Sequence, residues 1–218
     1  MKILDVPQSG SVAGVTSSRN RFGQYRRTRA IPVNPASTFQ MSVRARMQTN
    51  ADGWKALTAT QRDGWNSFGL YFTRTDSLGQ TYNLTGFMAY CSVNNNRLAA
   101  GDAVLADAPA YVPPAPIVTV TPTITSASFS VAWTPTPLSA GERIFISASP
   151  MRSAGVAYNG DFRLMAVSAA AGSSPFNLLS AYQARFGNPV TGSRIFVSVQ
   201  RYLNGLFSDP LVTSVVTS

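Results

Sequence analysis

The sequence contains no histidine, a single glutamate (Glu142) and a single cysteine (Cys91) among its 218 residues. Without histidine, no histidine general base, serine–histidine triad or histidine-ligated metal site can form. A lone cysteine excludes an internal disulfide and any metal site built from several cysteines. Neither a glycine-rich phosphate loop nor a dinucleotide-binding fingerprint is present. We therefore expect a protein that is not an enzyme and that uses no cofactor and no metal.

Long hydrophobic runs are also missing. No segment approaches the roughly 18 consecutive apolar residues that a membrane-spanning helix needs. The opening residues, MKILDVPQSGS, lack the apolar stretch of a signal peptide. These features predict synthesis in the cytoplasm and no membrane partner.

Acidic residues are scarce in the first half of the chain. Residues 1–100 carry a net charge of +8 and residues 101–218 a net charge of +1, within a total of +9. Nearly all the cations are arginine, whose planar guanidinium pairs with carboxylate or phosphate and stacks on aromatic rings. The basic half therefore predicts an acidic partner, which the nearly neutral half does not need.

The arginines concentrate in one stretch, residues 17–46, and no acidic residue lies between Asp5 and Asp52. Residues 17–33 show no apolar periodicity, so we predict that residues 1–34 form an extended basic arm that becomes ordered against a partner. A solvated basic loop is the alternative. The candidate partner-binding residues are Arg19, Arg21, Phe22, Tyr25, Arg26, Arg27, Arg29, Arg44 and Arg46.

Residues 35–100 predict a small helical domain. Asn34 and Pro35 fit the N-cap and first position of a helix. Thr58 and Gln61 fit a capping box that starts a second helix, and Thr85 can cap a third. We expect the first two helices to form a hairpin. Its first helix would turn inward a stripe formed by Phe39, Val43, Met47, Trp54 and Leu57.

The proline- and alanine-rich residues 101–116 predict a linker between domains. From residue 117 onward the pattern changes to short alternating segments separated by turn signals, which is typical of an antiparallel β-sandwich. Residues 178–186 are an exception with helical spacing, and we expect a short helix that crosses between the sheets. The fold class predicted for the whole chain is thus α+β. Strands are expected near residues 118–124, 129–133, 144–147, 164–168, 195–200 and 211–216.

Two segments of the C-terminal part carry a resemblance to a known domain. They are SFSVAWTP at residues 128–135, with Trp133 as the buried tryptophan of an early strand, and RIFVSVQRYLNGLFSDPLVTSVVTS at residues 194–218. With these segments, residues 117–218 resemble a fibronectin type III-like or immunoglobulin-like sandwich.

The N-terminal part carries a second resemblance. SRNRFGQYRRTRAIPVNPASTFQMSVRARM at residues 18–47 is followed by WKALTATQRDGWNSFG at residues 54–69. Together they resemble a family of virion-associated proteins of tailed bacteriophages and prophages. The resemblance implies a structural component of the virion, such as a capsid-associated, connector or tail protein. Its basic arm would anchor it to neighbouring virion subunits, with several copies in one particle.

Two other functions stay open. WKALTATQRDGWNSF also resembles the middle of an HMG box, which favours a nucleic-acid-binding or DNA-condensing protein whose arm contacts phosphate. Alternatively, the β domain could bind carbohydrate on a cell surface through aromatic side chains. The candidates for that face are Tyr158, Phe162, Tyr182 and Tyr202.

Overall fold

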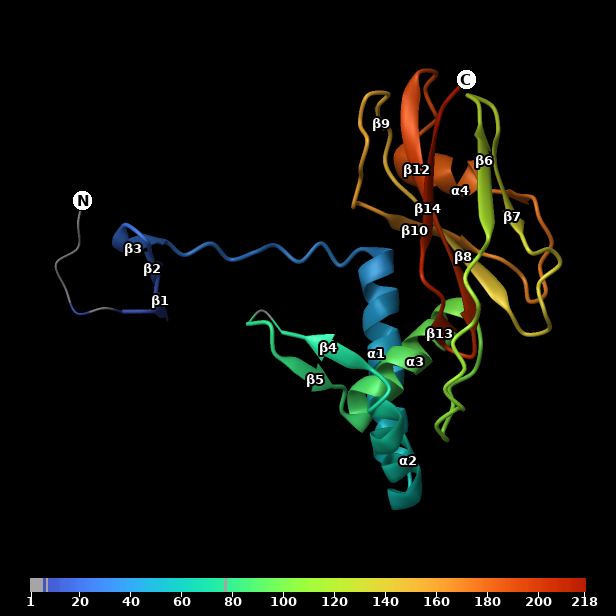
Figure 1. Ribbon diagram of the computed structural model, residues 1–218. Coiled ribbons are helices and arrows are strands. Elements are labelled where there is room, and N and C mark those ends of the chain that lie inside the picture. The colour runs from blue at the N-terminus through green and yellow to red at the C-terminus, as the bar shows by residue number, and fades with distance from the viewer. Residues whose placement is uncertain (1–5, 7, 77) are drawn as a thin grey trace. The chain divides into compact units, whose positions relative to one another are not determined.

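The computed structural model describes residue 6, residues 8–76 and residues 78–218. Residues 1–5 and 7, which belong to the predicted arm, lie outside the described residues. The chain is of the α+β class, with helices and several antiparallel sheets (Figure 1). It divides into two compact units, Met1–Ser42 and Val43–Ser218.

The N-terminal unit contains a three-stranded antiparallel sheet in the order β1 (Gly10–Val12), β2 (Val15–Asn20) and β3 (Gly23–Thr28). The prediction that residues 17–33 lack regular structure is therefore wrong as far as Thr28. The residues of the turn, rather than an alternation of apolar side chains, determine this hairpin. The side chain of Asn20 accepts a hydrogen bond from the backbone N–H of Phe22 at 2.9 Å, and Gly23 adopts a φ of +118°.

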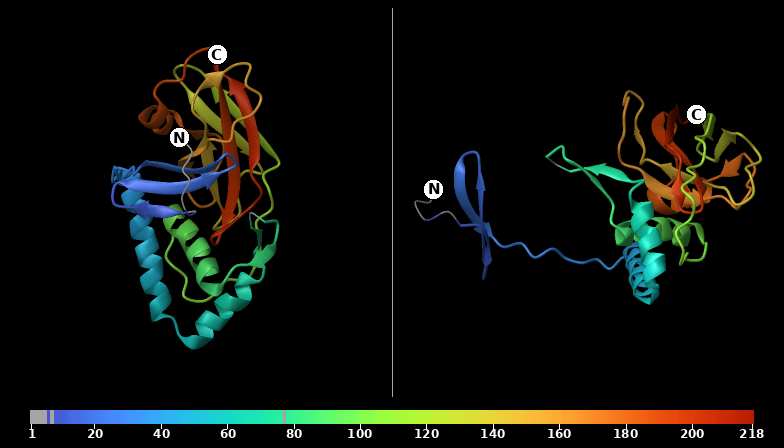
Figure 2. Two further views of the ribbon diagram at one scale, coloured as in Figure 1. Left: turned by 90° about the vertical axis from the view of Figure 1, so that its left-hand side faces the viewer. Right: turned by 60° about the horizontal axis from the view of Figure 1, so that its bottom comes forward.

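Residues 29–37 form neither helix nor strand and connect β3 to α1 (Thr38–Ala56) as an extended segment (Figure 2). Helix α1 begins later than the predicted start at residues 34–35. Asn34 instead accepts a hydrogen bond from the backbone N–H of Ala36, whose φ of +45° interrupts the helix. Ser37 and Gln40 then exchange side-chain and backbone hydrogen bonds in a capping-box pattern, so Ser37 is the cap.

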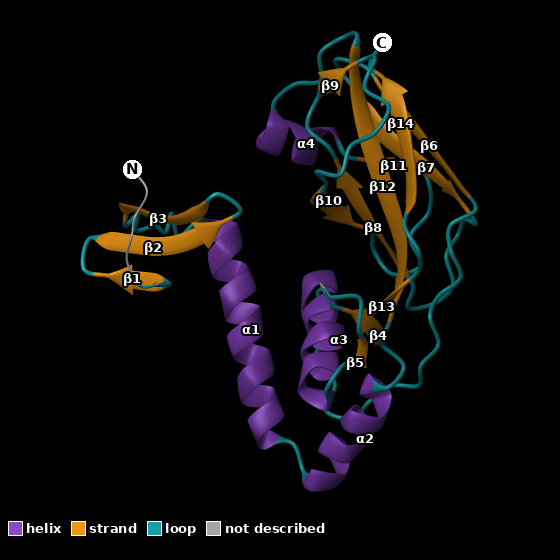
Figure 3. Ribbon diagram, turned by 60° about the vertical axis from the view of Figure 1, so that its left-hand side comes forward, coloured by secondary structure: helices purple, strands orange, loops and turns teal. Residues whose placement is uncertain are grey.

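The other two predicted helix starts are confirmed. Thr58 caps α2 (Ala59–Gly69) with a complete capping box, and Thr85 caps α3 (Gly86–Ala100). The predicted hairpin of the first two helices is wrong, because α2 packs closely against α3 (Figure 3). The turn at Leu57 directs α2 away from α1. Trp65 of α2 is fully buried in this helical core.

The segment predicted as a linker is packed against the helical core. Within residues 101–116, the backbone carbonyl of Ala106 accepts a 2.8 Å hydrogen bond from the indole N–H of Trp65. The side chain of the buried Asn94 binds both backbone groups of Leu105. The segment thus forms hydrogen bonds with the helices and packs apolar side chains against them. Residues 43–218 accordingly form one compact unit. Before α3, a short hairpin of β4 (Thr73–Thr75) and β5 (Thr81–Asn83) projects from the helices.

Two antiparallel sheets make up the β domain. The inner faces of both sheets contribute side chains to one shared core. Along the long strands, inward apolar residues therefore alternate with outward residues, and this alternation allowed the strands to be predicted from the sequence. The first sheet has the order β11 (Phe176–Asn177), β7 (Phe129–Thr134) and β6 (Thr119–Ile124). The second has the order β10 (Arg163–Val167), β8 (Arg143–Ala148), β12 (Ser193–Leu203) and β13 (Leu206–Phe207), while β9 (Arg152–Ser153) and β14 (Leu211–Val216) also pair with β12.

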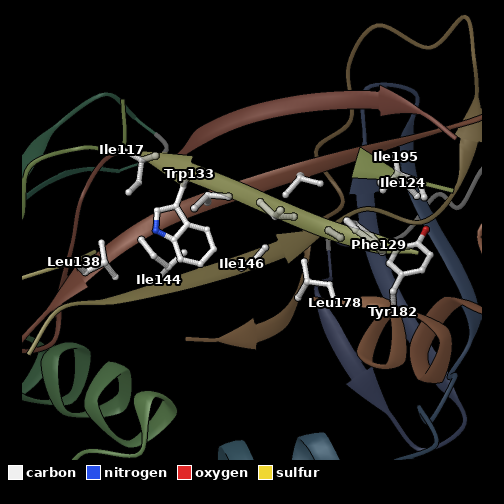
Figure 4. Packing of buried hydrophobic residues seen from close by; sticks show 14 residues of the cluster. Ile117, Ile124, Phe129, Trp133, Leu138, Ile144, Ile146, Leu178, Tyr182 and Ile195 are labelled. Carbon is white, nitrogen blue, oxygen red and sulfur yellow. The ribbon is translucent and has the colours of Figure 1, made fainter. Parts of the chain in front are cut away.

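Trp133 on β7 lies between the sheets, beside Ile144 on β8 (Figure 4). Helix α4 (Leu179–Phe186) follows β11 and precedes β12, so it crosses from one sheet to the other as predicted. Tyr182 of α4 enters the same core and donates its hydroxyl to the backbone carbonyl of Ser149 at 3.1 Å. Burial raises the pKa of Tyr182 to about 12.

An acidic side chain joins the helical part to the β domain. Asp102 directly follows the end of α3, and its carboxylate lies 2.8 Å from Arg143 of β8 and accepts a 2.8 Å hydrogen bond from the Tyr202 hydroxyl of β12. Burial alone would raise the pKa of Asp102, but the hydrogen bonds from Tyr202 and Arg143 outweigh that effect and hold the pKa below its ordinary value of 3.8. The carboxylate is therefore stabilised in its charged form.

We predict that Asp102→Asn lowers the free energy of unfolding by about 1–3 kcal/mol at pH 7, because Arg143 loses its charged acceptor. The pKa of Asp102 is lower in the folded chain than in the unfolded chain. This contribution is therefore present above the unfolded pKa and is lost as pH falls through the folded pKa. Urea titrations at neutral and acidic pH measure both effects. The control is Asp209→Asn, at an exposed position, and an equal loss in both variants would contradict the prediction.

Candidate assembly surface

The register of the N-terminal sheet distributes the predicted partner-binding residues over both of its faces. Paired residues share a face and successive residues alternate, so Arg19 and Arg26 lie on one face, together with Val12 and Val15. Tyr25 and Arg27 lie on the opposite face. The structure thus brings the arginines together on one small sheet but presents them in several directions.

The tip of the hairpin carries the next two predicted residues. The guanidinium of Arg21 stacks over the ring of Phe22, 4.6 Å from its centroid, and this ring is 76% exposed. A stacked arginine holds the aromatic ring in a defined orientation. The tip is therefore a preformed pair of a cation and an apolar ring on a two-residue turn.

The sheet has no core of its own. Among the described residues before Asn50, none is buried, and Val12, Val15, Phe22 and Tyr25 are all exposed. A three-stranded sheet normally needs a hydrophobic face packed on something in order to be stable. The N-terminal sheet therefore lacks, within its own unit, the packing that would hold it together.

The outer strand β3 also presents an edge. In the described structure β3 pairs with β2 alone, so alternate backbone N–H and C=O groups of Gly23–Thr28 point away from the sheet. Such an edge can accept a further strand, and charged side chains usually protect it from non-specific pairing. Arg26 and Arg27 occupy this strand, so the edge favours an acidic partner.

Of the remaining three predicted residues, Arg29 directly follows β3 in the connecting segment, and Arg44 and Arg46 lie on α1 in the second unit. The stripe predicted to turn inward on this helix is only partly confirmed. Leu57, at the turn after the helix, is buried, whereas Phe39 and Met47 are 53% and 43% exposed. In place of a continuous apolar stripe, the helix buries the polar Asn50.

The aromatic face proposed for carbohydrate does not form as predicted. Tyr182 and Tyr202 are fully buried in the β domain, where each hydroxyl donates a hydrogen bond to another part of the chain. Of the four candidates, Tyr158 is the one that is largely exposed. Tyr182 lies on α4 and Tyr202 on β12, and the composition of these elements did not show that both tyrosines face the core.

Sequence reasoning missed a groove between α2 and residues 108–111. It has a volume of about 290 Å³ and includes Tyr71 and Tyr111, whose rings stack in parallel with centroids 4.8 Å apart. The exposed Asp63 and Asp107 directly precede lining residues at Gly64 and Ala108. The proline-rich composition of the segment suggested a linker and so concealed its role as one wall of a groove.

Neither metal-binding clusters nor membrane-spanning helices were found in the part of the chain that the structure describes. No three residues among Asp, Glu and Cys gather there in a way that could hold a metal ion. None of the described helices combines the length and apolarity needed to cross a bilayer.

Comparisons with known proteins give little further information. No protein-family model and no curated protein matches the chain. Among solved structures, the chain is similar to a family 76 glycoside hydrolase from a bovine Bacteroides thetaiotaomicron strain. The match has a TM-score of 0.35 and 17% identity, and it covers 48% of this chain and 20% of the hydrolase. A similarity this low carries no argument about function.

We predict that deletion of residues 1–35 leaves the remaining chain as stable as the full chain, within about 0.5 kcal/mol, since none of the described residues of this segment is buried. Ser37 and the cap of α1 are retained in this variant. Urea unfolding and circular dichroism provide the measurement. A clear loss of stability would mean that the N-terminal unit contributes to the folding of the rest.

Proposed function

We propose that the protein is a non-enzymatic structural component of a bacteriophage virion, anchored to neighbouring virion subunits by its N-terminal sheet and the segment that follows it. The observation that carries the proposal is that residues 10–28 form a sheet without burying any side chain. Ordered backbone without a core is costly unless a partner covers it. The resemblance of roughly residues 9–98 to virion-associated proteins of bacteriophages suggests that this partner is a neighbouring virion subunit.

Charge supports an anchoring role for the same region. Many of the chain's own acids are already occupied: Asp52, Asp102, Glu142 and Asp161 each form an ion pair outside the N-terminal unit. The arginines of the sheet repel one another, and acidic groups on an adjacent subunit would relieve that repulsion. An assembled particle presents such groups at fixed positions.

The order of the strands supports a fibronectin type III-like fold for the β domain, which we propose as the finer description. Leaving aside β9 and β13, two short strands that pair only with β12, the first, second and fifth strands (β6, β7 and the equally short β11) form one sheet. The third, fourth, sixth and seventh form the other, with Trp133 inside. Domains of this architecture commonly serve as interaction modules without chemistry of their own. The β domain would then be a rigid body that projects from the particle or packs on its neighbours.

Nucleic-acid binding is a second candidate, favoured by the tip of the hairpin. Proteins that bind the minor groove combine arginines with an apolar wedge between base steps. Arg21 and the exposed Phe22 offer that combination at the tip of the β2–β3 hairpin. Arg19 and Arg26 on the strands would then contact phosphate.

We predict that residues 1–35 are needed for incorporation into particles. Replacing Arg19, Arg21, Arg26, Arg27 and Arg29 with Gln should reduce the copy number in purified particles severely, as should deletion of residues 1–35. Quantitative mass spectrometry of the particles measures the copy number. The control replaces Arg74 and Arg185, exposed arginines outside the N-terminal unit, and should incorporate normally. Normal incorporation of the deletion variant would rule out this anchor.

A gel-shift titration separates the two candidate functions. Binding through phosphates weakens with salt at a log–log slope of about −0.9 per phosphate neutralised. The structural role predicts only weak, salt-labile binding to DNA of any sequence. Tight and sequence-selective binding near physiological salt would favour the nucleic-acid candidate.

A further inference from the structure

The longer edge strands of the β domain are protected against the addition of a further strand. Strand β6 contains Pro122, which has no backbone N–H to donate, and β14 lies against β6. Strand β10 has an irregular register between Leu164 and Ala166, and Arg185 of α4 donates a hydrogen bond to the backbone carbonyl of Leu164 at 3.3 Å. Each of these edges is therefore interrupted or covered.

Strand β3 is as long as β6 but lacks these features. All of its residues are described, and they include no proline. Its pairing with β2 runs without a register shift from Gly23 to Thr28. The arginines of β3 discourage pairing with most strands, but they attract a strand that carries acidic side chains. The edge is therefore selective for a partner of opposite charge.

The hydrogen bonds of the hairpin identify the groups that this edge presents. Arg29 donates its backbone N–H to the carbonyl of Gly14 at 2.8 Å, and this pair continues the register of β2 and β3. Alternate pairs of an antiparallel ladder are hydrogen-bonded, so the backbone groups of Gln24, Arg26 and Thr28 point away from β2. A strand added to β3 would form its hydrogen bonds with these residues.

The side chains along the edge indicate the chemistry of the added strand. Residues opposite one another share a face, and the neighbour of Arg27 on β2 is the uncharged Thr16. On the added strand, the residue opposite Arg27 would belong to a pair without backbone hydrogen bonds, in which antiparallel side chains lie closest together. An Asp or Glu at that position would pair with the guanidinium, and an aromatic or β-branched residue two positions away would contact Tyr25.

We propose that an extended segment of a neighbouring virion subunit adds to β3 as a fourth, antiparallel strand of the sheet and carries an acidic residue opposite Arg27. The inference rests on the proposed function and specifies how the anchor binds. Backbone hydrogen bonds supply affinity in this mode of recognition, and the side chains supply specificity. A second copy of β3 is disfavoured as the added strand, because it would bring further arginines and no acid to the same edge.

Proline substitution on the two outer strands tests the proposal in the full chain. Thr28→Pro removes an outward N–H of β3 without removing a hydrogen bond to β2, so it should lower the copy number in purified particles by about tenfold or more. The matched control is Ser11→Pro on β1, whose N–H points away from β2 by the same alternation, and it should enter particles normally. Quantitative mass spectrometry measures both. Normal entry of Thr28→Pro, or an equal loss in both variants, would overturn the proposal.

Photo-cross-linking identifies the added strand. A chain with p-benzoylphenylalanine in place of Tyr25 should cross-link to a different virion protein in assembled particles. Sequencing of the linked peptide by mass spectrometry should find an Asp or Glu about two residues from the linked position, because Tyr25 and Arg27 are neighbours on one face of β3. A link to a second copy of this chain, or to a segment without such an acid, would overturn the proposal.

Failure of this inference can be told apart from failure of the proposed function. If Thr28→Pro enters particles normally while deletion of residues 1–35 prevents entry, the anchor binds through another surface and the structural role stands. If the deletion variant also enters normally, both proposals fail.

Discussion

The lack of a core in the N-terminal sheet is the constraint on which the account of this protein depends. Three strands form backbone hydrogen bonds with one another, yet no side chain of the sheet is buried. Hydrogen bonding alone contributes little net stability, because the unfolded chain bonds equally well to water. A hairpin that is set by its turn residues but lacks packing therefore opens readily in the free chain, and a partner that covers it supplies the packing that stabilises it.

The second unit has the opposite character. Its helices and sheets bury aromatic and aliphatic side chains in two clusters. It also contains an ion pair of Asp102 with Arg143 and a buried ion pair of Glu142 with Arg201. Removal of one partner from such a pair leaves a buried charge. Glu142 and Arg201 both lie in the β domain, so it is the contact of Asp102 with Arg143 and Tyr202 that favours a single arrangement of the helical part and the β domain. The chain thus couples a rigid body to a basic segment whose surfaces are uncovered.

Sequence patterns predicted those parts of the fold whose causes are local. The caps at Thr58 and Thr85 were recognisable because a threonine hydroxyl meets a backbone N–H within one helical turn. Strand β12 was predicted because Ile195, Val197 and Val199 alternate with Phe196, Ser198 and Gln200. The hairpin of Val15–Thr28 was missed because both of its faces are polar, and only the turn from Asn20 to Gly23 indicated it.

Features that depend on tertiary contact could not be predicted in the same way. Residues 101–116 have the composition of a linker, and their packing depends on the position of Trp65, 41 residues distant from Ala106. With the exception of Arg44 and Arg46 on α1, the candidate residues lie on the N-terminal sheet, in its hairpin turn or, for Arg29, directly after it, which the sequence did not indicate. The groove at Tyr71 and Tyr111 arises from segments that are distant in sequence, so no pattern could have revealed it.

Amide hydrogen exchange over residues 15–28 tests the central claim most directly. In the free chain, the account predicts that these amides exchange almost as fast as those of an unstructured peptide, because opening a sheet without a core costs little free energy. In the assembled particle the same amides should be protected by at least about tenfold more, as partner groups cover the sheet. Protection in the free chain equal to that of strand β12 would contradict the account, since the sheet would then be stable without a partner.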